Sequence, residues 1–554
     1  MHYNILIGGA AGQGIDTTTT ILAKLLKKEG YAVLATHDLM SRIRGGHNFV
    51  LIRFGDYPVD SHSMALDGLI ALDDDTVALH LKDLKKDGFI LCDQTIKTDD
   101  KRAIKAPLTE IAKELGNPRV SGSIANGIIL KLFNLSLNGL ETVLKQELAS
   151  QYIDINLKAF EKGFNLVQSR YQKLNGDSSD YMLINGSKAV ALGALAGGIK
   201  FYSAYPMSPS TGIMEFLATK SKELDVVVEQ AEDEIAAINM AIGASFTGVR
   251  AMTGTSGGGF SLMVEALGLS GIAEIPLVVV DVQRPGPATG LPTRTEQSDL
   301  RFVMHASQGE FPRKVIAIRN HEDAYYQTIK ALDTAEKYQM PVIILSDQYL
   351  ADGLATIKPV TLPKGTKTSI PEIKADEYKR YLITENGISP RLNPGQTEHL
   401  VNADSDEHDE QGLITESATV RNSMMEKRMR KLQGVIEELE EPDFFGSKKA
   451  DVLLIGWGST WGPIKEAVDL LNEITPDKYS ALVFGDVYPL PEKLLQARTK
   501  QAKTIINIEQ NATGQFAGLI REKTGIVCTN SILKYDGRQI SAEEIVEQVK
   551  EAKI

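Results

Sequence analysis

Residues 276–281 read PLVVVD, a proline followed by branched apolar residues and closed by an aspartate. Residues 341–347 read PVIILSD and repeat this arrangement. Continuous apolar runs of this length are typical of strands buried on both faces, which occur in parallel sheets covered by helices on each side. The two runs therefore predict a parallel α/β domain, which we bound at residues 182–355.

Two further α/β segments flank this domain. Residues 1–175 alternate strand and helix patterns, which predicts a parallel sheet of βαβ units, and a polar stretch at 173–180 marks their end. Residues 447–554 open with the apolar run DVLLIGWG at 451–458. In the first segment we expect strands at 3–8, 32–36, 48–54, 67–72 and 88–92.

Residues 356–446 differ in composition from the α/β segments. They contain prolines and glycines, the acidic run DSDEHDE at 404–410 and a charged helical pattern from Met424 to Glu441. We interpret this region as a long surface linker with one helix, and we expect its acidic part to be solvated. The predicted fold class is therefore α/β, with three parallel-sheet domains and one long linker.

The composition excludes several classes of protein. The chain has 554 residues, 43% hydrophobic and 24% charged, with a net charge of −12. An acidic surface repels phosphate backbones, which argues against a nucleic-acid partner. The sequence contains no run of ~18 apolar residues, so no membrane span is predicted. A strand pattern begins at the first residues without a basic stretch before it, which favours a cytoplasmic location. Two cysteines, Cys92 and Cys528, are too few for a four-cysteine iron–sulfur cluster.

A glycine-rich loop, GGAAGQGID at 8–16, follows the first expected strand. Gly9 and Gly14 have the spacing of a phosphate-binding loop, but Ile15 stands where that loop requires lysine. The dinucleotide fingerprint fails too, because Thr17 occupies its third glycine position. The loop is either a tight strand-to-helix turn or a contact for an anionic ligand or partner at this end of the sheet.

A basic segment, RIRGGHN at 42–48, follows the second expected strand. Open parallel sheets bind ligands at the carboxyl ends of their strands, where Arg42 and Arg44 are expected to lie. A solvated basic loop is the alternative interpretation.

The middle domain contains a stiffened strand-to-helix junction, FYSAYPMSPSTGIMEFL at 201–217. Pro206 and Pro209 restrict the backbone of this turn, and hydroxyl residues surround the second proline. The junction is either a rigid turn alone or a turn that presents the hydroxyl of Ser208 to a ligand.

An acidic turn precedes an apolar helical pattern in EQAEDEIAAINMAIG at 229–243. Ile235, Ile238 and Ile242 are expected to form one apolar stripe. Carboxylates at a helix N-terminus complement its dipole without any further role. A carboxyl on the stripe side, however, would be buried and able to hold a proton near neutral pH.

Two loops in the same domain suit a ligand. The run TGTSGGGF at 253–260 has three consecutive glycines, which admit a flat ligand against the backbone. The loop RPGPATGLPTRTEQ at 284–297 follows the PLVVVD strand. Arg284 at its start is a candidate clamp for a carboxylate, although a lone arginine is more often a surface charge.

Together these motifs resemble the α subunits of 2-oxoacid:ferredoxin oxidoreductases in which a γ domain is fused to the α chain, and the pattern is most similar to 2-oxoglutarate enzymes. The resemblance covers nearly the whole chain. It implies a γ-like domain at 1–175, a thiamine-diphosphate pyrimidine-binding domain at 182–355 and a transketolase C-terminal-like domain at 447–554. The most specific pieces are YPMSPST (205–211), EDEIAAINMAIGASFTG (232–248), TGTSGGGF (253–260) and RPGPATGLPTRTEQSDL (284–300).

The resemblance implies roles for individual residues. Glu234 is the catalytic glutamate that contacts the aminopyrimidine ring of thiamine diphosphate, with Glu232 as the alternative if the register shifts by two. Ser208 stands where the family commonly has threonine in a YPITP pattern, which keeps a hydroxyl and loses a methyl group. The other implied contacts are Tyr205, Pro206, Arg284 and Thr289 for the substrate, Thr255, Ser256 and Gly257 for thiamine diphosphate, and Gly12, Gln13, Gly14 and Arg44 for coenzyme A.

The resemblance also implies partners. The sequence lacks the GDG triplet that opens the diphosphate and magnesium motif of thiamine enzymes. A β subunit is expected to carry Mg²⁺, the diphosphate site and a [4Fe–4S] cluster in an (αβ)2 complex, so no metal is expected in this chain. Ferredoxin is the expected electron acceptor and coenzyme A the co-substrate.

The expected reaction is the reversible, coenzyme A-dependent oxidative decarboxylation of 2-oxoglutarate to succinyl-CoA and CO2, catalysed only together with the β subunit. Pyruvate or a broad range of 2-oxoacids is an alternative substrate. A subunit of a non-oxidative thiamine-dependent decarboxylase is an alternative activity. A regulatory protein that binds a nucleotide at residues 8–14 is a third possibility, against which the missing lysine argues.

Overall fold

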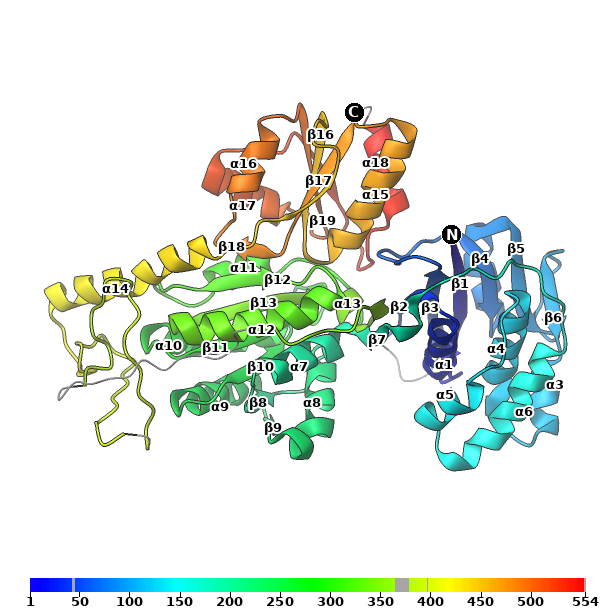
Figure 1. Ribbon diagram of the computed structural model, residues 1–554, viewed down its shortest axis with the longest axis horizontal. Helices are drawn as coiled ribbons and strands as arrows, with labels where there is room; N and C mark the ends of the chain where they lie inside the picture. The colour runs from blue at the N-terminus through cyan, green and yellow to red at the C-terminus, as the bar shows by residue number, and fades with distance from the viewer. Residues whose placement is uncertain (42–44, 364–377, 396, 553–554) are drawn as a thin grey trace. The chain divides into compact units, whose positions relative to one another are not determined.

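The computed structural model describes residues 1–41, 45–363, 378–395 and 397–552. The chain forms two compact units (Figure 1). The first unit contains Met1–Asn185, Asp352–Pro359 and Ser541–Glu543, and the second contains Gly186–Ala351, Val360–Ile540 and Glu544–Ile554. Helices and three sheets, two of them mostly parallel and one mixed, confirm the α/β class. The four-segment domain division stays a prediction. Among the described helices, none combines the length and apolarity that a bilayer crossing requires.

The first unit is built on an eight-stranded sheet in the order β6-β5-β4-β1-β3-β2-β14-β7. The expected strands are present, but the prediction of a wholly parallel sheet is wrong: β3 runs antiparallel to β1 and β2. The link between β2 and β3 is too short for a helical crossover, so these strands form a hairpin. The strands are β1 (His2–Ala11), β2 (Ala32–Asp38), β3 (Gly45–Gly55), β4 (Leu66–Ala71), β5 (Leu84–Asp93), β6 (Ala103–Ala106), β7 (Met182–Asn185) and β14 (Leu354–Ile357).

Side chains that alternate along β1 divide the core of this unit between two faces. Ile5 and Ile7 lie in the larger cluster with five helices, whereas Leu6 packs with α2 (Asp74–His80) on the other face. Two of the five helices meet at backbone distance, because a Cβ on Gly163 would lie 2.0 Å from the carbonyl oxygen of Ile124. The five helices are α1 (Ile15–Lys28), α3 (Leu108–Glu114), α4 (Ser121–Leu132), α5 (Leu140–Glu147) and α6 (Ile153–Phe164).

The second unit contains a seven-stranded sheet in the order β18-β12-β13-β11-β10-β8-β9. All neighbours from β12 to β9 are parallel, and only β18 at the edge is antiparallel. The two apolar runs predicted as buried strands are β11 and β13, and every residue of both is buried. The strands are β8 (Phe201–Ala204), β9 (Val227–Gln230), β10 (Ala251–Thr255), β11 (Leu277–Gln283), β12 (Lys314–Ala317), β13 (Pro341–Asp347) and β18 (Asp486–Tyr488).

Helices cover both faces of this sheet. One face carries α9 (Glu234–Phe246), α10 (Gly257–Ile272) and α11 (Leu300–His305), whose buried residues share a single core cluster. Four helices belong to the connections on the other side: α7 (Gly186–Ala196), α8 (Thr211–Leu224), α12 (His321–Tyr338) and α13 (Gln348–Asp352).

The third sheet, also in the second unit, has the order β15-β17-β16-β19-β20. Trp457 of β16 and Phe516 of α17, which covers this sheet, belong to the same core cluster as Leu300 and Val303 of α11, so the two sheets of this unit share one core. The elements are β15 (Asp443–Gly446), β16 (Val452–Trp457), β17 (Tyr479–Phe484), β19 (Thr504–Glu509), β20 (Asn530–Leu533), α15 (Trp461–Ile474), α16 (Lys493–Thr499), α17 (Gln515–Thr524) and α18 (Ala542–Glu551).

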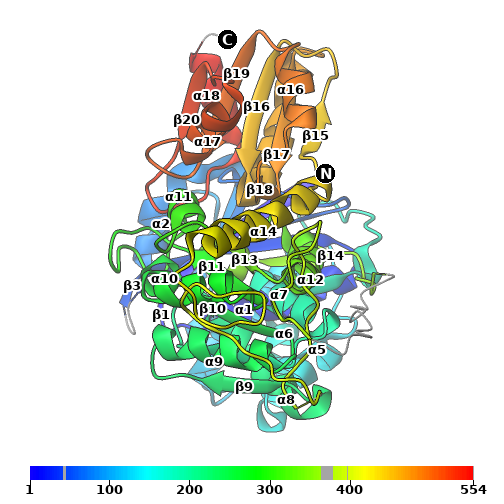
Figure 2. The same cartoon turned by 90° about the vertical axis from the view of Figure 1, so that its left-hand side faces the viewer.

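The predicted helix of the linker is α14 (Ala418–Glu437), which packs against α12 (Figure 2). Lys427 and Lys431 are fully buried in α14 and both form ion pairs with the equally buried Glu274. Charge attraction offsets the cost of burying these groups, and the nearby cations hold the pKa of Glu274 well below its usual value although burial opposes them.

The prediction of a solvated acidic run is wrong for its central residues. Glu407 accepts hydrogen bonds from Arg428 at 2.7 and 3.1 Å, and His408 is fully buried with its ring 4.1 Å from that of Tyr381. These contacts fix the acidic run to the folded unit.

Candidate active site

Four parallel strands of the second unit, β9, β8, β10 and β11, end at the same edge of the sheet. Parallel α/β sheets bind ligands at this edge, beyond the carboxyl ends of their strands. The predicted residues follow these strands: Tyr205, Pro206 and Ser208 come after β8, Glu234 after β9, Thr255, Ser256 and Gly257 at the end of β10, and Arg284 and Thr289 after β11.

Glu234 is the first residue of α9 and is 4% exposed, whereas Glu232 is exposed. Asp233 caps the helix, because its extended backbone lets its carboxylate accept the N–H of Ala236 at 2.7 Å. Oε1 of Glu234 has no hydrogen-bond partner among the described residues. A buried carboxyl oxygen without a partner is costly in a folded chain, which marks it as a candidate contact for a ligand.

The glycines that begin α10 lie directly beside Glu234. A Cβ on Gly259 would lie 2.5 Å from Oε1 of Glu234 and 2.2 Å from Oγ1 of Thr255, so only glycine fits this position. By contrast, a Cβ on Gly258 would have no neighbour closer than 3.7 Å. The hydroxyl of Ser256 is buried and has no partner in the described part of the chain. The first turn of α10 therefore presents backbone and open space beside an unpaired carboxyl oxygen.

Arg284 joins two of the loops at this edge. Its Nη1 donates a hydrogen bond to the carbonyl oxygen of Ser208 at 2.7 Å. The two residues meet through the backbone of Ser208, whose own side chain is exposed. Burial lowers the pKa of the Arg284 guanidinium, and the carboxylate of Asp299 opposes this shift. Tyr205 in the same turn is 39% exposed.

The loop after Arg284 is folded tightly on itself. Leu291 donates its N–H to the carbonyl oxygen of Pro285 at 3.0 Å, and a Cβ on Gly290 would lie 1.8 Å from that oxygen. Gly290 has φ 53°, a conformation that favours glycine. Thr289 is exposed at this turn.

The apolar stripe predicted on α9 is only partly correct. Ile238 and Ile242 are buried, but Ile235 is 50% exposed. The helix is apolar on nearly all sides, so the spacing of isoleucines does not distinguish its inner face from its outer face.

Sequence reasoning gave no role to two aspartates at this edge, the buried Asp281 on β11 and the partly buried Asp299 before α11. Burial raises the pKa of Asp281 well above its usual value, and the charge of Asp299 raises it further. Burial raises the pKa of Asp299 to about 6, against the opposing effect of Arg284. Asp281 closes the PLVVVD run and Asp299 lies in TEQSDL, but neither pattern indicates that the two side chains interact.

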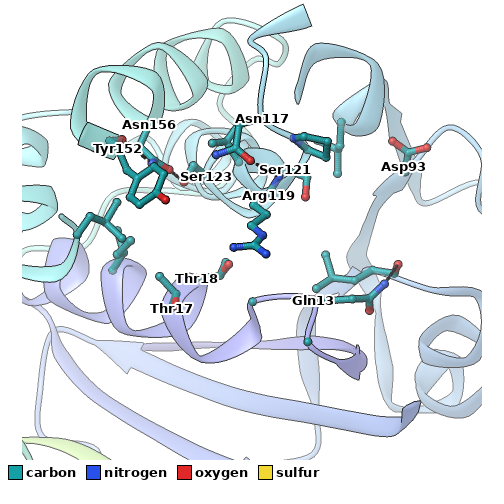
Figure 3. Close-up of a pocket in the computed structure, with 18 of the residues that line it drawn as sticks. Gln13, Thr17, Thr18, Asp93, Asn117, Arg119, Ser121, Ser123, Tyr152 and Asn156 are labelled. Atoms are coloured by element: carbon teal, nitrogen blue, oxygen red, sulfur yellow. Dashed lines mark hydrogen bonds between the residues drawn. The ribbon is translucent and has the colours of Figure 1, made fainter. Parts of the chain in front are cut away.

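The first unit contains a separate cavity of about 690 Å³ at the N-terminus of α1 (Figure 3). The predicted residues Gly12, Gln13 and Gly14 line it. Arg44, and Arg42 of the same basic segment, lie outside the described residues. The other polar lining residues are Thr17, Thr18, Asp93, Asn117, Arg119, Ser121, Ser123, Tyr152 and Asn156.

Arg119 is the only basic residue among the described residues that line this cavity, and Figure 3 shows its guanidinium pointing inward. Asn117 holds the turn before α4 by accepting the N–H of Arg119 at 3.0 Å. The carboxylate of Asp93 accepts hydrogen bonds from the backbone N–H groups of Thr95 and Thr109, so these bonds partly satisfy it within the protein. The cavity thus combines hydroxyls, one arginine and the first-turn amides of α1, which is a suitable environment for an anionic group.

Two family models match the chain and assign it to a class of thiamine-diphosphate-binding oxidoreductases. The family model described as "Pyruvate flavodoxin/ferredoxin oxidoreductase, thiamine diP-bdg" matches residues 192–427. The model described as "Pyruvate ferredoxin/flavodoxin oxidoreductase" matches residues 4–166.

Two relatives and one solved structure narrow the class. The 2-oxoacid:ferredoxin oxidoreductase subunit alpha of Sulfolobus sp is 35% identical over 99% of this chain and 96% of its own length. The 2-oxoglutarate oxidoreductase subunit KorA of Mycobacterium tuberculosis is 31% identical over 78% of this chain and 68% of its own. The structure of 2-oxoglutarate:ferredoxin oxidoreductase from Magnetococcus marinus, with 2-oxoglutarate, coenzyme A and succinyl-CoA bound, has a TM-score of 0.93, 32% identity and 99% coverage of both chains. The chain belongs to the α subunits of the 2-oxoacid:ferredoxin oxidoreductases, in the form with a fused γ domain.

Proposed function

We propose that the edge formed by β9, β8, β10 and β11 binds the pyrimidine half of thiamine diphosphate and a 2-oxoacid. The reaction is the reversible, coenzyme A-dependent oxidative decarboxylation of 2-oxoglutarate to succinyl-CoA and CO2, with electrons passed to ferredoxin through a β subunit. The observation that carries the proposal is the buried, unpaired Oε1 of Glu234 beside the glycines of α10.

The residues present fit thiamine diphosphate. When bound, this cofactor supplies the carbon nucleophile and the electron sink that the decarboxylation of a 2-oxoacid needs. Glu234 gives a buried carboxyl that holds or donates a proton at a ring nitrogen, and Gly259 keeps the approach to Oε1 clear. Thr255, Ser256 and Gly257 complete the contact, with the Ser256 hydroxyl available for a hydrogen bond.

Arg284 binds the carboxylate of the 2-oxoacid. Its guanidinium has one hydrogen bond to the Ser208 backbone, which leaves further N–H groups to donate. The loop at Gly290 holds the arginine at the strand end. Tyr205, Pro206 and Ser208 belong to the turn that Arg284 contacts, and Thr289 belongs to the loop that Arg284 begins. We therefore propose that the exposed Ser208 hydroxyl and Thr289 side chain contact the rest of the substrate.

The likeness to the Magnetococcus marinus enzyme supports 2-oxoglutarate as the substrate, because that protein is named for 2-oxoglutarate and spans the same length. The KorA relative carries the same substrate in its name. A viologen-reduction assay of the assembled complex with coenzyme A tests the choice. Turnover with 2-oxoglutarate is expected to exceed turnover with pyruvate, and equal or reversed rates would assign a broader or a pyruvate specificity.

The outer faces of α9 and α10 support a β subunit as the partner at the edge site. Ile235, Met240 and Leu262 are 50%, 41% and 50% exposed. Within residues 234–246 and 257–272 the only charged side chains are Glu234 and Glu265. Helices that are apolar on all sides are normally covered, so this surface, defined by Ile235, Met240 and Leu262, is the α9–α10 face that receives the β subunit with its Mg²⁺, diphosphate site and [4Fe–4S] cluster.

Coenzyme A binds in the cavity of the first unit. Its phosphates are the anionic groups that the first-turn amides of α1 and the Arg119 guanidinium favour. Gly12 and Gly14 suit a close approach, because a Cβ on either would meet no atom within 4 Å. The side chain of Gln13 is held by the N–H of Ala10 at 2.7 Å, which fixes the loop.

The decisive experiment replaces Glu234 by glutamine in the α chain co-expressed with its β subunit. Glu234→Gln is expected to lower viologen reduction by at least about 100-fold, because proton transfer by a placed carboxyl contributes about that much. Glu232→Gln, two residues away and exposed, is the matched control and should keep the wild-type rate. Wild-type activity in Glu234→Gln, with assembly intact, would refute the assignment.

A further inference from the structure

Gln297 lies near the far end of the loop that Arg284 begins, and it is bonded to the third sheet through its main chain and its side chain. Its N–H donates to the carbonyl oxygen of Gln510 at 2.7 Å, and its Oε1 accepts the N–H of Gln510 at 3.2 Å. Its Nε2 donates to the carbonyl oxygen of Trp457 at 2.8 Å, and its carbonyl oxygen accepts from Nδ2 of Asn511 at 3.2 Å. Gln297 is 1% exposed, so these four bonds are shielded from solvent.

The partners of Gln297 lie at one edge of the third sheet. Trp457 is the last residue of β16, and Gln510 and Asn511 follow the end of β19 directly. Because β16 and β19 are parallel neighbours, their carboxyl ends meet at this edge. Parallel α/β sheets bind ligands at such an edge. In this chain the amide of Gln297 is bonded to both strand ends there.

The residues that bond to Gln297 are themselves held in place. Oδ1 of Asn511 accepts the N–H of Gly514 at 2.8 Å, and Oε1 of Gln510 accepts the N–H of Ile540 at 2.8 Å. Both Gln510 and Asn511 are fully buried or nearly so. Buried polar groups that find their partners make the structure around them rigid. Gln297 is therefore bonded to a rigid part of the third sheet.

Asp299, two residues further along, connects this anchor to the proposed active site. Its N–H donates to Oε1 of the buried Gln283 at 3.1 Å, which closes the loop at the residue before Arg284. Its carboxyl rests against the first turn of α10, because a Cβ on Gly257 would lie 2.4 Å from its Oδ2. A displacement of Gln297 would therefore reach both the base of Arg284 and the proposed cofactor contact at Gly257.

We propose that Gln297 is a positioning residue that anchors the loop of residues 284–299 to the third sheet and thereby fixes where Arg284 meets the carboxylate of the 2-oxoacid. Gln297 acts through the loop and not by contact with the substrate. The carboxyl edge of the third sheet then serves as the brace of the substrate loop. This inference rests on the proposed role of Arg284 in binding the substrate carboxylate.

The test replaces Gln297 by methionine in the α chain co-expressed with its β subunit. Methionine has a similar length and volume but cannot form the side-chain bonds to Trp457 and Gln510. Calorimetric titration with N-oxalylglycine, an analogue of 2-oxoglutarate that is not decarboxylated, is expected to show roughly 10-fold weaker binding, because a small displacement of a binding group is costly. Coenzyme A should bind with unchanged affinity, since its proposed cavity belongs to the first unit.

Asn472→Leu is the matched control. The amide of Asn472, on α15 beside the third sheet, also bonds to main chain in both directions: it donates to the carbonyl oxygen of Tyr479 and accepts the N–H of Tyr479, each at 3.0 Å. This variant should lower the melting temperature as Gln297→Met does, but it should leave the affinity for the analogue unchanged. Equal losses of affinity in the two variants would overturn the proposal, because a general loosening of the third sheet would then explain both.

A second variant decides the matter if Gln297→Met does not assemble. Gln515, the first residue of α17, donates to the carbonyl oxygen of Ser298 at 2.6 Å and accepts the N–H of Arg301 at 2.9 Å. Gln515→Met removes these two bonds on either side of Asp299 from a partly buried position, and it is expected to weaken binding of the analogue by about threefold. Unchanged affinity in Gln515→Met would then overturn the proposal.

Arg284→Ala separates this inference from the proposed function. If Arg284→Ala binds the analogue as tightly as wild type, the proposed function of Arg284 fails. If Arg284→Ala loses binding while Gln297→Met binds the analogue like wild type, only the role of Gln297 fails.

Discussion

The β1–α1 and β10–α10 junctions both turn from strand to helix through glycines, but the side chains around the two turns carry opposite charge. Each places glycines where a strand turns into a helix, Gly12 and Gly14 in the first unit and residues 257–259 in the second. At α1 the glycines open into a cavity of about 690 Å³ with Arg119 and several hydroxyls. At α10 they are bordered by the carboxyls of Glu234 and Asp299.

This contrast shows that a glycine turn before a helix does not by itself define its ligand. First-turn amides favour anions at α1, where Arg119 in the lining adds to the effect of the helix dipole. At α10 the adjacent carboxyls oppose an anion and favour a group that accepts or shares a proton. The side chains that face the turn, supplied by distant parts of the chain, decide between a phosphate and a neutral ring.

The largest expected effect concerns the β10–α10 junction, where carboxyls border the glycines. In Gly259→Ala the new Cβ would overlap Oε1 of Glu234 and Oγ1 of Thr255, and displacement of the carboxyl is expected to lower viologen reduction by roughly 100-fold. Overpacking is also expected to destabilise the chain by about 1–3 kcal/mol, measured by thermal unfolding. Gly258→Ala, where a Cβ has open space, should keep the wild-type melting temperature. Equal behaviour of the two variants would contradict the packing described for α10.

The next effect concerns the α9–α10 face beside the same junction. Leu262→Glu introduces a charge on this face and is expected to weaken assembly with the β subunit by roughly 30-fold, the loss of a strong interface contact. Co-purification and size-exclusion chromatography measure it. Leu224→Glu, at a residue that is 44% exposed at the end of α8, is the control and should assemble normally. If Leu262→Glu assembles as wild type, the β subunit binds another surface.

A smaller change is expected at the β1–α1 junction, whose cavity is lined by Arg119 and several hydroxyls. Arg119→Ala is expected to raise the KM for coenzyme A by roughly 10–100-fold, since a hydrogen bond to a charged group contributes about 1.5–3 kcal/mol. The KM for the 2-oxoacid should not change. Arg102→Ala removes a surface arginine paired with Asp100 in the same unit and should leave both constants unaltered. A rise in both KM values in Arg119→Ala would indicate a general structural defect instead.

The smallest effect concerns the proline-stiffened turn. Ser208→Thr introduces the threonine of the YPITP pattern and keeps a hydroxyl at this position. The substitution should change turnover with 2-oxoglutarate by less than about fivefold, because Arg284 contacts the backbone of residue 208 and not its side chain. The ratio of 2-oxoglutarate to pyruvate turnover is the sensitive measurement. A change of 100-fold would mean that the side chain, and not the backbone, positions the arginine.

Much of the second unit was predictable from its sequence, because buried parallel strands give unbroken apolar runs such as those of β11 and β13. The site edge was predictable for the same reason: loops after parallel strands converge. Glu234 differs from Glu232 in burial because Asp233 caps α9 and sets the helix start between them. That cap fixes which carboxyl faces inward, and it is a local feature that the sequence contains.

Features that depend on distant contacts were not predictable. The hairpin of β2 and β3 is a different case, because the short link that distinguishes it from a βαβ unit is visible in the sequence. The position of the Asp299 carboxyl against Gly257 depends on how the loop folds back after β11. Arg119 faces the glycine loop from a turn more than a hundred residues away, and its local sequence carries no sign of this.

The crossing of α4 and α6 in the first unit limits how the cavity can be remodelled. Because Gly163 meets the backbone of Ile124 and Ser123 donates a hydrogen bond to Asn156 at 2.5 Å, this wall is set by main-chain spacing and not by side-chain size. Trimming side chains there would leave its position unchanged. An engineered or naturally diverged chain that accepts a bulkier thioester carrier must therefore gain room elsewhere in the lining, for example at the exposed Thr17 of α1.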